Sequence, residues 1–240
     1  MIAKLDILAI GIHPDDVEIS ASGTLIRHVR MGRSCGVVHL SKGELGTRGT
    51  AAIRMKEAAL AAKIMGLAVM DTCSMRDGFF SNDETHQGMI IEKIRMYRPD
   101  IVLCNAFNDR HPDHGRAAQL TADACFYSGL LKIKTSLNGK AQQAWRPKAV
   151  YHYIQDRGIR PDFVVDISKE INLKMKAIKA YSSQFYKKDS KEPATYISSP
   201  AFLKSIRDRS AEFGRIIGVE YAEGFTSQRY PGVNDLFHLV

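Results

Sequence analysis

The chain has 240 residues, and its hydrophobic content of 45% and charged content of 25% are ordinary for a soluble globular protein. No run approaches the roughly 18 apolar residues of a membrane span, and the N-terminus lacks the features of a signal peptide, so we expect a cytoplasmic protein without membrane contact. The net charge of +8 favours an anionic partner. Basic residues do not interleave with aromatic ones as single-stranded nucleic-acid binding requires, so a solvated surface explains the charge most simply, followed by an anionic substrate.

The first predicted element is a strand at residues 5–12, a continuous apolar run without proline that is too short for a helix. His13-Pro14-Asp15-Asp16 breaks this run, and the apolar spacing of residues 17–31 predicts a helix that Gly32 ends. Beyond it the pattern predicts strands at 36–40, 67–73, 101–105, 149–154 and 163–167, and helices at 53–67, 84–97, 115–131, 171–185 and 200–217.

This alternation predicts an α/β fold with a mostly parallel sheet and helices on both faces. We expect one domain over residues 1–240, because the chain shows no repeat, low-complexity tract or convincing linker. An active site would lie at the carboxyl ends of the strands. Residues 186–199 are the most loop-like part, and covering the site is one role open to them. The four cysteines form no CxxC pair and are interpreted as reduced core residues.

Two short segments carry candidate metal ligands, His13-Pro14-Asp15-Asp16 after the first strand and Arg110-His111-Pro112-Asp113-His114 after the fourth. Each lies where a predicted strand ends and a helix begins, and such ends can be neighbours in a doubly wound sheet. Histidine and aspartate before a helix are often caps or surface residues. Two equivalent segments among only eight histidines nevertheless favour one shared site. His13, Asp16 and His114 would supply three donors and leave a fourth position open, as catalytic zinc sites do.

The residues beside these ligands predict metal-assisted amide hydrolysis. Asp15 is adjacent to Asp16 without being a ligand, so it can take a proton from water and deliver it to the leaving amine. His111 can stabilise the tetrahedral oxyanion, best as an imidazolium. Asp113 could orient His111 and keep it charged, as a carboxylate partner does.

At these residues the sequence resembles the LmbE-like, or PIG-L, family of zinc N-acetylglucosaminyl deacetylases. His-Pro-Asp-Asp with Glu18, Gly23 and Thr24 downstream is similar to the first family motif, and His-Pro-Asp-His at 111–114 matches the second. The match looks closest to the branch that deacetylates N-acetylglucosaminyl malate in bacillithiol biosynthesis. The features that support this branch are 43–50 (Gly-Glu-Leu-Gly-Thr-Arg-Gly-Thr), Arg54 with Glu57-Ala58, Arg76-Asp77, Ser183-Gln184 and 218–225 (Gly-Val-Glu-Tyr-Ala-Glu-Gly-Phe).

The resemblance implies His13, Asp16 and His114 as zinc ligands, Asp15 as general base, and His111 as oxyanion stabiliser with Asp113 behind it. It also implies sugar contacts from Arg54 and Asp77, a Rossmann-like fold, and, in this branch, a hexamer of two trimers. Ser20-Ala21-Ser22 and His152 depart from the residues that relatives often carry, which leaves the fine substrate preference open.

Several interpretations stay open at this point. Without the resemblance, Arg54 is most simply an exposed helix arginine, whereas the resemblance favours a substrate contact. Asp77 suits a turn as well as a sugar contact, and Arg110 suits either an ion pair with the acidic cluster or a clamp for a substrate carboxylate. The metal set suits Zn2+ but would also accept Fe2+ or another divalent ion. The expected partners are an anionic amino-sugar substrate and further copies of the chain. Alternatives to GlcNAc-malate are a GlcNAc-inositol, a cysteine-conjugated sugar or an antibiotic sugar, and, more distantly, a non-catalytic basic binding module.

Overall fold

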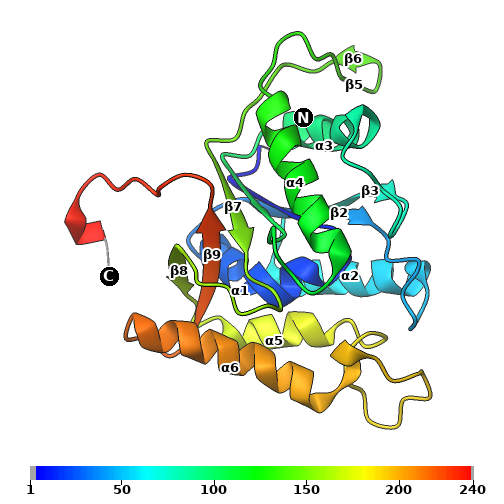
Figure 1. Cartoon of the computed structure of the whole chain (residues 1–240), viewed down its shortest axis with the longest axis vertical. Helices are drawn as coiled ribbons and strands as arrows, with labels where there is room; N and C mark the ends of the chain where they lie inside the picture. The colour runs from blue at the N-terminus through cyan, green and yellow to red at the C-terminus, as the bar shows by residue number, and fades with distance from the viewer. Residues whose placement is uncertain (1–3, 239–240) are drawn as a thin grey trace.

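Apolar runs form the middle strands of the sheet. In the computed structural model, which describes residues 4–238, β1 (Ile7–Gly11) and β2 (Cys35–Ser41) are buried at every position. Strands buried on both faces need helices above and below them, and Figure 1 shows helices on both sides of the sheet. The predicted α/β fold with a mostly parallel sheet is thereby confirmed.

Within residues 4–238, the main sheet has seven strands in the order β3-β2-β1-β4-β7-β9-β8. The first five are parallel, whereas β9 runs antiparallel to both of its neighbours. Strand β9 was not predicted, because its sequence, Ala-Glu-Gly-Phe-Thr-Ser, has neither an apolar run nor regular alternation. The further strands are β3 (Val69–Met75), β4 (Ile101–Cys104), β7 (Ala149–Tyr153), β8 (Phe163–Asp166) and β9 (Ala222–Ser227), with the separate hairpin of β5 (Ser136–Leu137) and β6 (Lys140–Ala141).

Among the described residues, two large apolar cores and a small third one hold the helices to the sheet. One large core joins the sheet to α1 (Asp16–Arg30), α2 (Ala51–Met65) and α5 (Ile171–Lys179). The other large core joins it to α3 (Glu84–Tyr97) and α4 (Pro112–Tyr127). The last helix, α6 (Pro200–Ile216), packs against β8 and β9. In the described part of the chain, no helix combines the length and apolar character that crossing a bilayer requires.

Helix boundaries differ from the prediction where side chains bind the backbone. The predicted helix 171–185 ends at Lys179, and the chain then turns so that the backbone N–H of Ser183 donates to Glu57 of α2 (2.7 Å). The helix expected from residue 115 begins earlier, at Pro112, because proline suits the first helical turn and His111 caps it.

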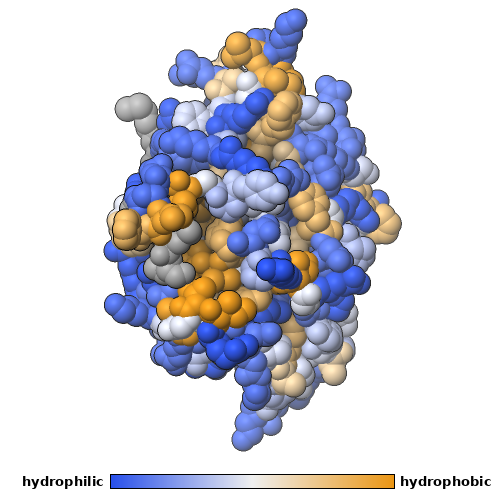
Figure 2. All heavy atoms as spheres, turned by 60° about the vertical axis from the view of Figure 1, so that its left-hand side comes forward, coloured by the Kyte–Doolittle hydropathy of each residue, from blue (hydrophilic) through white to orange (hydrophobic). Residues whose placement is uncertain are grey.

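The segment after β9 leaves the body of the molecule. Figure 2 looks onto the side from which this segment projects, and hydrophobic residues gather there in one area that hydrophilic residues surround. Within the described segment, Tyr230, Leu236 and Phe237 expose more than three quarters of their surface. This is an unusual amount of large apolar surface to leave in water.

The complete burial of β1 predicts that substitutions in this strand destabilise the fold most. Ile10 lies in β1 and is fully buried, so Ile10→Ala should lower the free energy of unfolding by about 2–5 kcal/mol. Leu60 of α2 is half-exposed, and Leu60→Ala should change it by less than about 0.5 kcal/mol. Urea unfolding followed by circular dichroism measures both, and equal midpoints for the two variants would contradict this description of the core.

Candidate metal-dependent active site

The turn between β1 and α1 places two adjacent carboxylates at the end of the sheet. Asp15 has φ 115°, a backbone conformation that favours glycine and costs a residue with a side chain about 1–3 kcal/mol. Arg54 stabilises the turn, because its guanidinium donates to the Pro14 carbonyl (2.7 Å) and to Asp15 Oδ2 (3.2 Å). The carbonyl of Asp15 also accepts from the Ile19 N–H (2.9 Å), which starts the helix.

The loop between β4 and α4 supplies the other half of the site. His111 caps α4, and its Nδ1 accepts from the Asp113 N–H (3.3 Å). His114 lies in the first turn of the helix, where its Nδ1 contacts Asp109 Oδ2 at 2.6 Å. That short contact fixes the ring orientation and turns Nε2 toward Asp16, as a carboxylate commonly does for a metal-binding imidazole.

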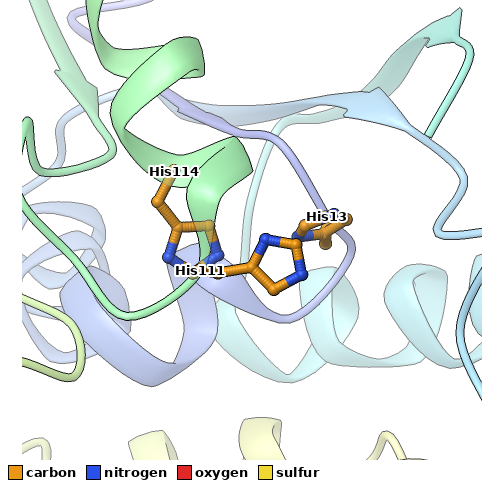
Figure 3. A group of neighbouring side chains, drawn as sticks. All are labelled: His13, His111 and His114. Carbon is orange, nitrogen blue, oxygen red and sulfur yellow. The ribbon is translucent and has the colours of Figure 1, made fainter. Parts of the chain in front are cut away.

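Three imidazoles converge at this point (Figure 3). His111 and His114 come from the start of α4, and His13 comes from the loop after β1. The ring centroids are 4.8 Å apart for His13 and His111, 5.7 Å for His13 and His114, and 5.2 Å for His111 and His114. One nitrogen of each ring lies within 4.8 Å of the other two, so the three rings can reach a common ion.

Asp16 lies between two of these rings. Its Oδ2 is 3.7 Å from His13 Nδ1, and its Oδ1 is 3.2 Å from His114 Nε2. Asn105 donates to Oδ2 (3.0 Å) and Gln155 donates to Oδ1 (2.8 Å), so amide groups hold both oxygens of the carboxylate. The residues predicted as ligands, His13, Asp16 and His114, thus lie together. His111, predicted to act on the oxyanion, is close enough to be a fourth donor.

The charges around the site suit a cation. Burial alone would lower the pKa of His13, but Asp113, Asp77 and Asp16 raise it to about 9. His114 behaves in the same way, because Asp16 and Asp109 outweigh its burial and raise its pKa to about 10. A site that draws protons onto two buried imidazoles is strongly negative. A divalent ion with a preference for nitrogen and oxygen ligands fits this donor set.

Asp15 has the environment of a general base. The residue is buried, and burial raises the pKa of its carboxyl to about 6 in spite of the neighbouring Arg54 guanidinium. A carboxyl with a pKa near the working pH can both accept and return a proton. Asp16, beside it, differs because the two imidazoles outweigh burial and hold its pKa well below the usual range.

The structure gives His111 and Asp113 a different relationship from the one expected. Burial and the neighbouring histidines lower the pKa of His111, which disfavours the imidazolium form. The Asp113 carboxylate does not orient this ring, because it faces the Gly78 N–H (3.1 Å), His13 Nε2 (3.4 Å) and Arg116 (3.5 Å). The contact between the two residues is instead the one from the Asp113 backbone N–H to His111 Nδ1. In the neutral ring Nδ1 then accepts, so Nε2 carries the hydrogen.

The three residues predicted to bind substrate line one cavity of about 570 Å³, a size that suits a small ligand. Arg54 is buried and donates to protein atoms, including the Gly43 carbonyl (3.1 Å). Asp77 contacts His13 Nε2 (2.9 Å) and accepts from the Leu45 N–H (3.0 Å). Arg110 is the exposed one, held by Asp156 (2.7 Å) and lying 4.3 Å over the Tyr196 ring.

Sequence reasoning missed the residues that orient the site. Asn105 and Gln155 follow two neighbouring strands and bind Asp16, and Asp109 binds His114. The position of Asp109, five residues before His114 in the same loop, was the one available signal. Residues 186–199 contribute Thr195, Tyr196 and Ile197 to the cavity wall, and Arg48 reaches Ser190 in this segment (2.8 Å).

Comparison with known proteins places both halves of the site within one family. The profile for PIG-L, described as GlcNAc-PI de-N-acetylase, matches residues 8–125. Diacetylchitobiose deacetylase of Thermococcus kodakarensis is 27% identical over 228 residues, which cover 91% of this chain and 81% of that protein.

Two solved structures share the fold over nearly the whole chain. A conserved protein of Thermus thermophilus is 30% identical with a TM-score of 0.85, and the match covers 97% of this chain and 98% of that one. The N,N'-diacetylchitobiose deacetylase of Pyrococcus horikoshii, solved with an inhibitor, is 25% identical with a TM-score of 0.80, covering 98% and 88%.

Metal binding should release protons. In the metal-free protein the pKa values of His13 and His114 lie at about 9 and 10, so both rings are protonated at pH 7, and ligation requires them neutral. Binding of Zn2+ at pH 7 should therefore release about two protons per ion, and the affinity should rise with pH. Titration calorimetry in two buffers of different ionisation enthalpy measures this number. Proton release near zero would contradict the predicted ligands, and His86→Gln, outside the site, should match the unaltered protein.

Proposed function

The chain belongs to the PIG-L, or LmbE-like, family of N-deacetylases, and we propose that its substrate is N-acetylglucosaminyl malate, converted to glucosaminyl malate and acetate in bacillithiol biosynthesis. The enzyme is a hydrolase that cleaves the linear amide C–N bond of an N-acetyl group. The observation that carries the proposal is a buried carboxylate, Asp15, beside a cluster of imidazole and carboxylate donors and facing the same cavity.

We assign the metal to His13, Asp16 and His114, with Zn2+ as the proposed ion. Bound there, zinc would polarise the acetyl carbonyl and lower the pKa of a water molecule. Asp16 can bind the metal only as a charged carboxylate, and the hydrogen bonds from Asn105 and Gln155 stabilise that charge. The donor set alone would also accept Fe2+.

The protein residues then divide the proton transfers between them. Asp15 accepts a proton from the water that attacks the acetyl carbon, and later delivers it to the sugar nitrogen as the C–N bond breaks. His111, neutral with its hydrogen on Nε2, donates to the oxygen that becomes negative in the tetrahedral state. A neutral donor replaces the imidazolium expected from the sequence, because the Asp113 carboxylate is engaged elsewhere.

The rim of the cavity supports an anionic conjugate. Arg110 and Arg116 line it with side chains that are partly exposed, and the malate group would bring two carboxylates. Guanidinium groups bind carboxylates in a two-point contact. Asp77 lies deeper, beside His13, where it can accept from sugar hydroxyls.

A second candidate is a disaccharide such as diacetylchitobiose. Phe79 lines the same cavity and is 63% exposed, with the Arg76 guanidinium 4.5 Å from its ring. An exposed aromatic ring beside a sugar site suits stacking against a second sugar. Two deacetylases among the relatives are named for diacetylchitobiose.

Asp15→Asn tests the mechanism. An amide cannot take the proton, so kcat for acetate release should fall about 10²–10⁴-fold, while zinc content measured by mass spectrometry should not change. Asp208→Asn, on the exposed surface of α6, is the control and should keep full activity. Turnover above about a tenth of normal in Asp15→Asn, with zinc bound, would remove Asp15 from the mechanism.

Arg110→Gln tests the substrate. If Arg110 binds a carboxylate of the conjugate, KM for GlcNAc-malate should rise about tenfold or more, while KM for N-acetylglucosamine alone should stay unchanged. Arg146→Gln, outside the cavity, should alter neither. Preference for diacetylchitobiose over GlcNAc-malate in the unaltered enzyme, with Arg110→Gln like the parent, would favour the second candidate.

We also propose that the protein is a homo-oligomer. The exposed apolar side chains of the C-terminal segment, Leu236 and Phe237 among them, support contact with a second copy. Light scattering after size-exclusion chromatography should give more than one chain per particle, and replacing both residues by serine should reduce that number. A monomeric parent protein would contradict the proposal.

A further inference from the structure

Two sequence features that the proposed chemistry does not use meet in the structure, although about 200 residues separate them. The backbone N–H of Gly23 donates to Glu223 Oε1 (2.9 Å), and that of Thr24 donates to Oε2 (2.7 Å). Gly23 and Thr24 lie in the middle of α1, whereas Glu223 belongs to β9. One carboxylate therefore binds the backbone of a helix with both oxygens.

Lys174 of α5 completes the contact. Its Nζ donates to Glu223 Oε1 (2.6 Å) and to the Ile19 carbonyl of α1 (2.6 Å). The side chains of Lys174 and Glu223 are 1% and 2% exposed. An ion pair this deeply buried is costly to desolvate. A protein that carries apolar side chains of similar size in its place is often equally stable. What apolar side chains cannot do is bind three backbone groups of α1, at Ile19, Gly23 and Thr24.

Glycine at position 23 allows the close approach. A β-carbon there would come within 2.7 Å of the Ile167 side chain, which follows β8. The helix therefore lies nearer to this side of the sheet than a larger residue would permit. The first family motif, with Gly23 and Thr24, and the segment 218–225 are thus parts of one contact.

Ile19 connects this contact to the catalytic turn. Its N–H donates to the carbonyl of Asp15 (2.9 Å), and its own carbonyl accepts from Lys174. Asp15 has the strained backbone, which persists only where its surroundings hold it. Arg54 holds that turn from one side, and the Lys174–Glu223 pair holds the helix that follows it.

We infer that Glu223, together with Lys174, is a positioning residue that fixes the first two turns of α1 and thereby keeps Asp15 and Asp16 at the metal site. The inference rests on the proposed function for its consequence in catalysis. The effect of Glu223 on the position of α1 does not involve the metal, so it can also be tested in the metal-free protein.

Glu223→Gln is the first test, because the amide can no longer accept from both N–H groups of α1. In the metal-free protein, amides of residues 16–20 should exchange with deuterium at least about tenfold faster than in the parent. The dissociation constant for Zn2+, measured against a competing chelator, should rise about tenfold to a hundredfold.

Glu170→Gln is the matched control. Glu170 is also buried and also joins α5 to α1, through Arg30 (2.6 Å), but it does so at the far end of α1. This variant should lose some stability and keep both the exchange rates at residues 16–20 and the zinc affinity. Equal effects of Glu223→Gln and Glu170→Gln on these two measurements would overturn the inference.

A double variant, Lys174→Met with Glu223→Leu, separates position from stability. Apolar replacement should leave the thermal midpoint near that of the parent, whereas zinc affinity should fall as in Glu223→Gln. Tight zinc binding in this variant would overturn the inference. A parent protein that binds zinc and releases no acetate would instead overturn the proposed function, and the exchange comparison would still decide the role of Glu223.

Discussion

The strained backbone at Asp15 is the constraint on which the rest of the site depends. Because the chain turns there with φ 115°, β1 ends and α1 begins within five residues, and the carboxylates of Asp15 and Asp16 reach the same cavity. Glycine would adopt this conformation without strain, but it would bring no carboxylate. The buried Arg54 offsets the strain by holding the Pro14 carbonyl and the Asp15 side chain together.

The charge of the site follows from that geometry. Asp16, Asp77, Asp109 and Asp113 all contact His13 or His114, so each negative charge has an imidazole partner. In the absence of an ion, the protons on the two rings offset only part of the charge of the four carboxylates, so the site stays negative. The same arrangement explains why the pKa values of the two neighbouring aspartates differ. Asp16 faces the two rings, which lower the pKa of its carboxyl, whereas burial raises the pKa of Asp15 by more than the Arg54 guanidinium lowers it.

The sequence was sufficient for the parts of the fold that rest on apolar runs and for the two segments that end in histidine. The run at residues 5–12 predicted β1, and the equivalence of two strand ends predicted that His13 and His114 meet. It was not sufficient for β9, whose pairing depends on neighbours far along the chain. Nor could helix position show that the Arg54 guanidinium turns inward to the Pro14 carbonyl, or that Asp113 faces His13 and Gly78. Such choices depend on three-dimensional packing, which spacing along the chain does not encode.

The position of β9 in the sheet has a consequence for folding during synthesis. This strand lies between β7 and β8 in the sheet, although it is the last of them to be synthesised. A growing chain on the ribosome can pair β1, β2, β3 and β4 early. Strand β8 has no neighbour in the sheet until β9 (residues 222–227) emerges and pairs with both β7 and β8. Contacts between such distant parts of a chain form slowly. Residues 222–227 must therefore reach both β7 and β8 before the sheet is complete, and only then can Glu223 contact α1 behind the turn that carries Asp15 and Asp16.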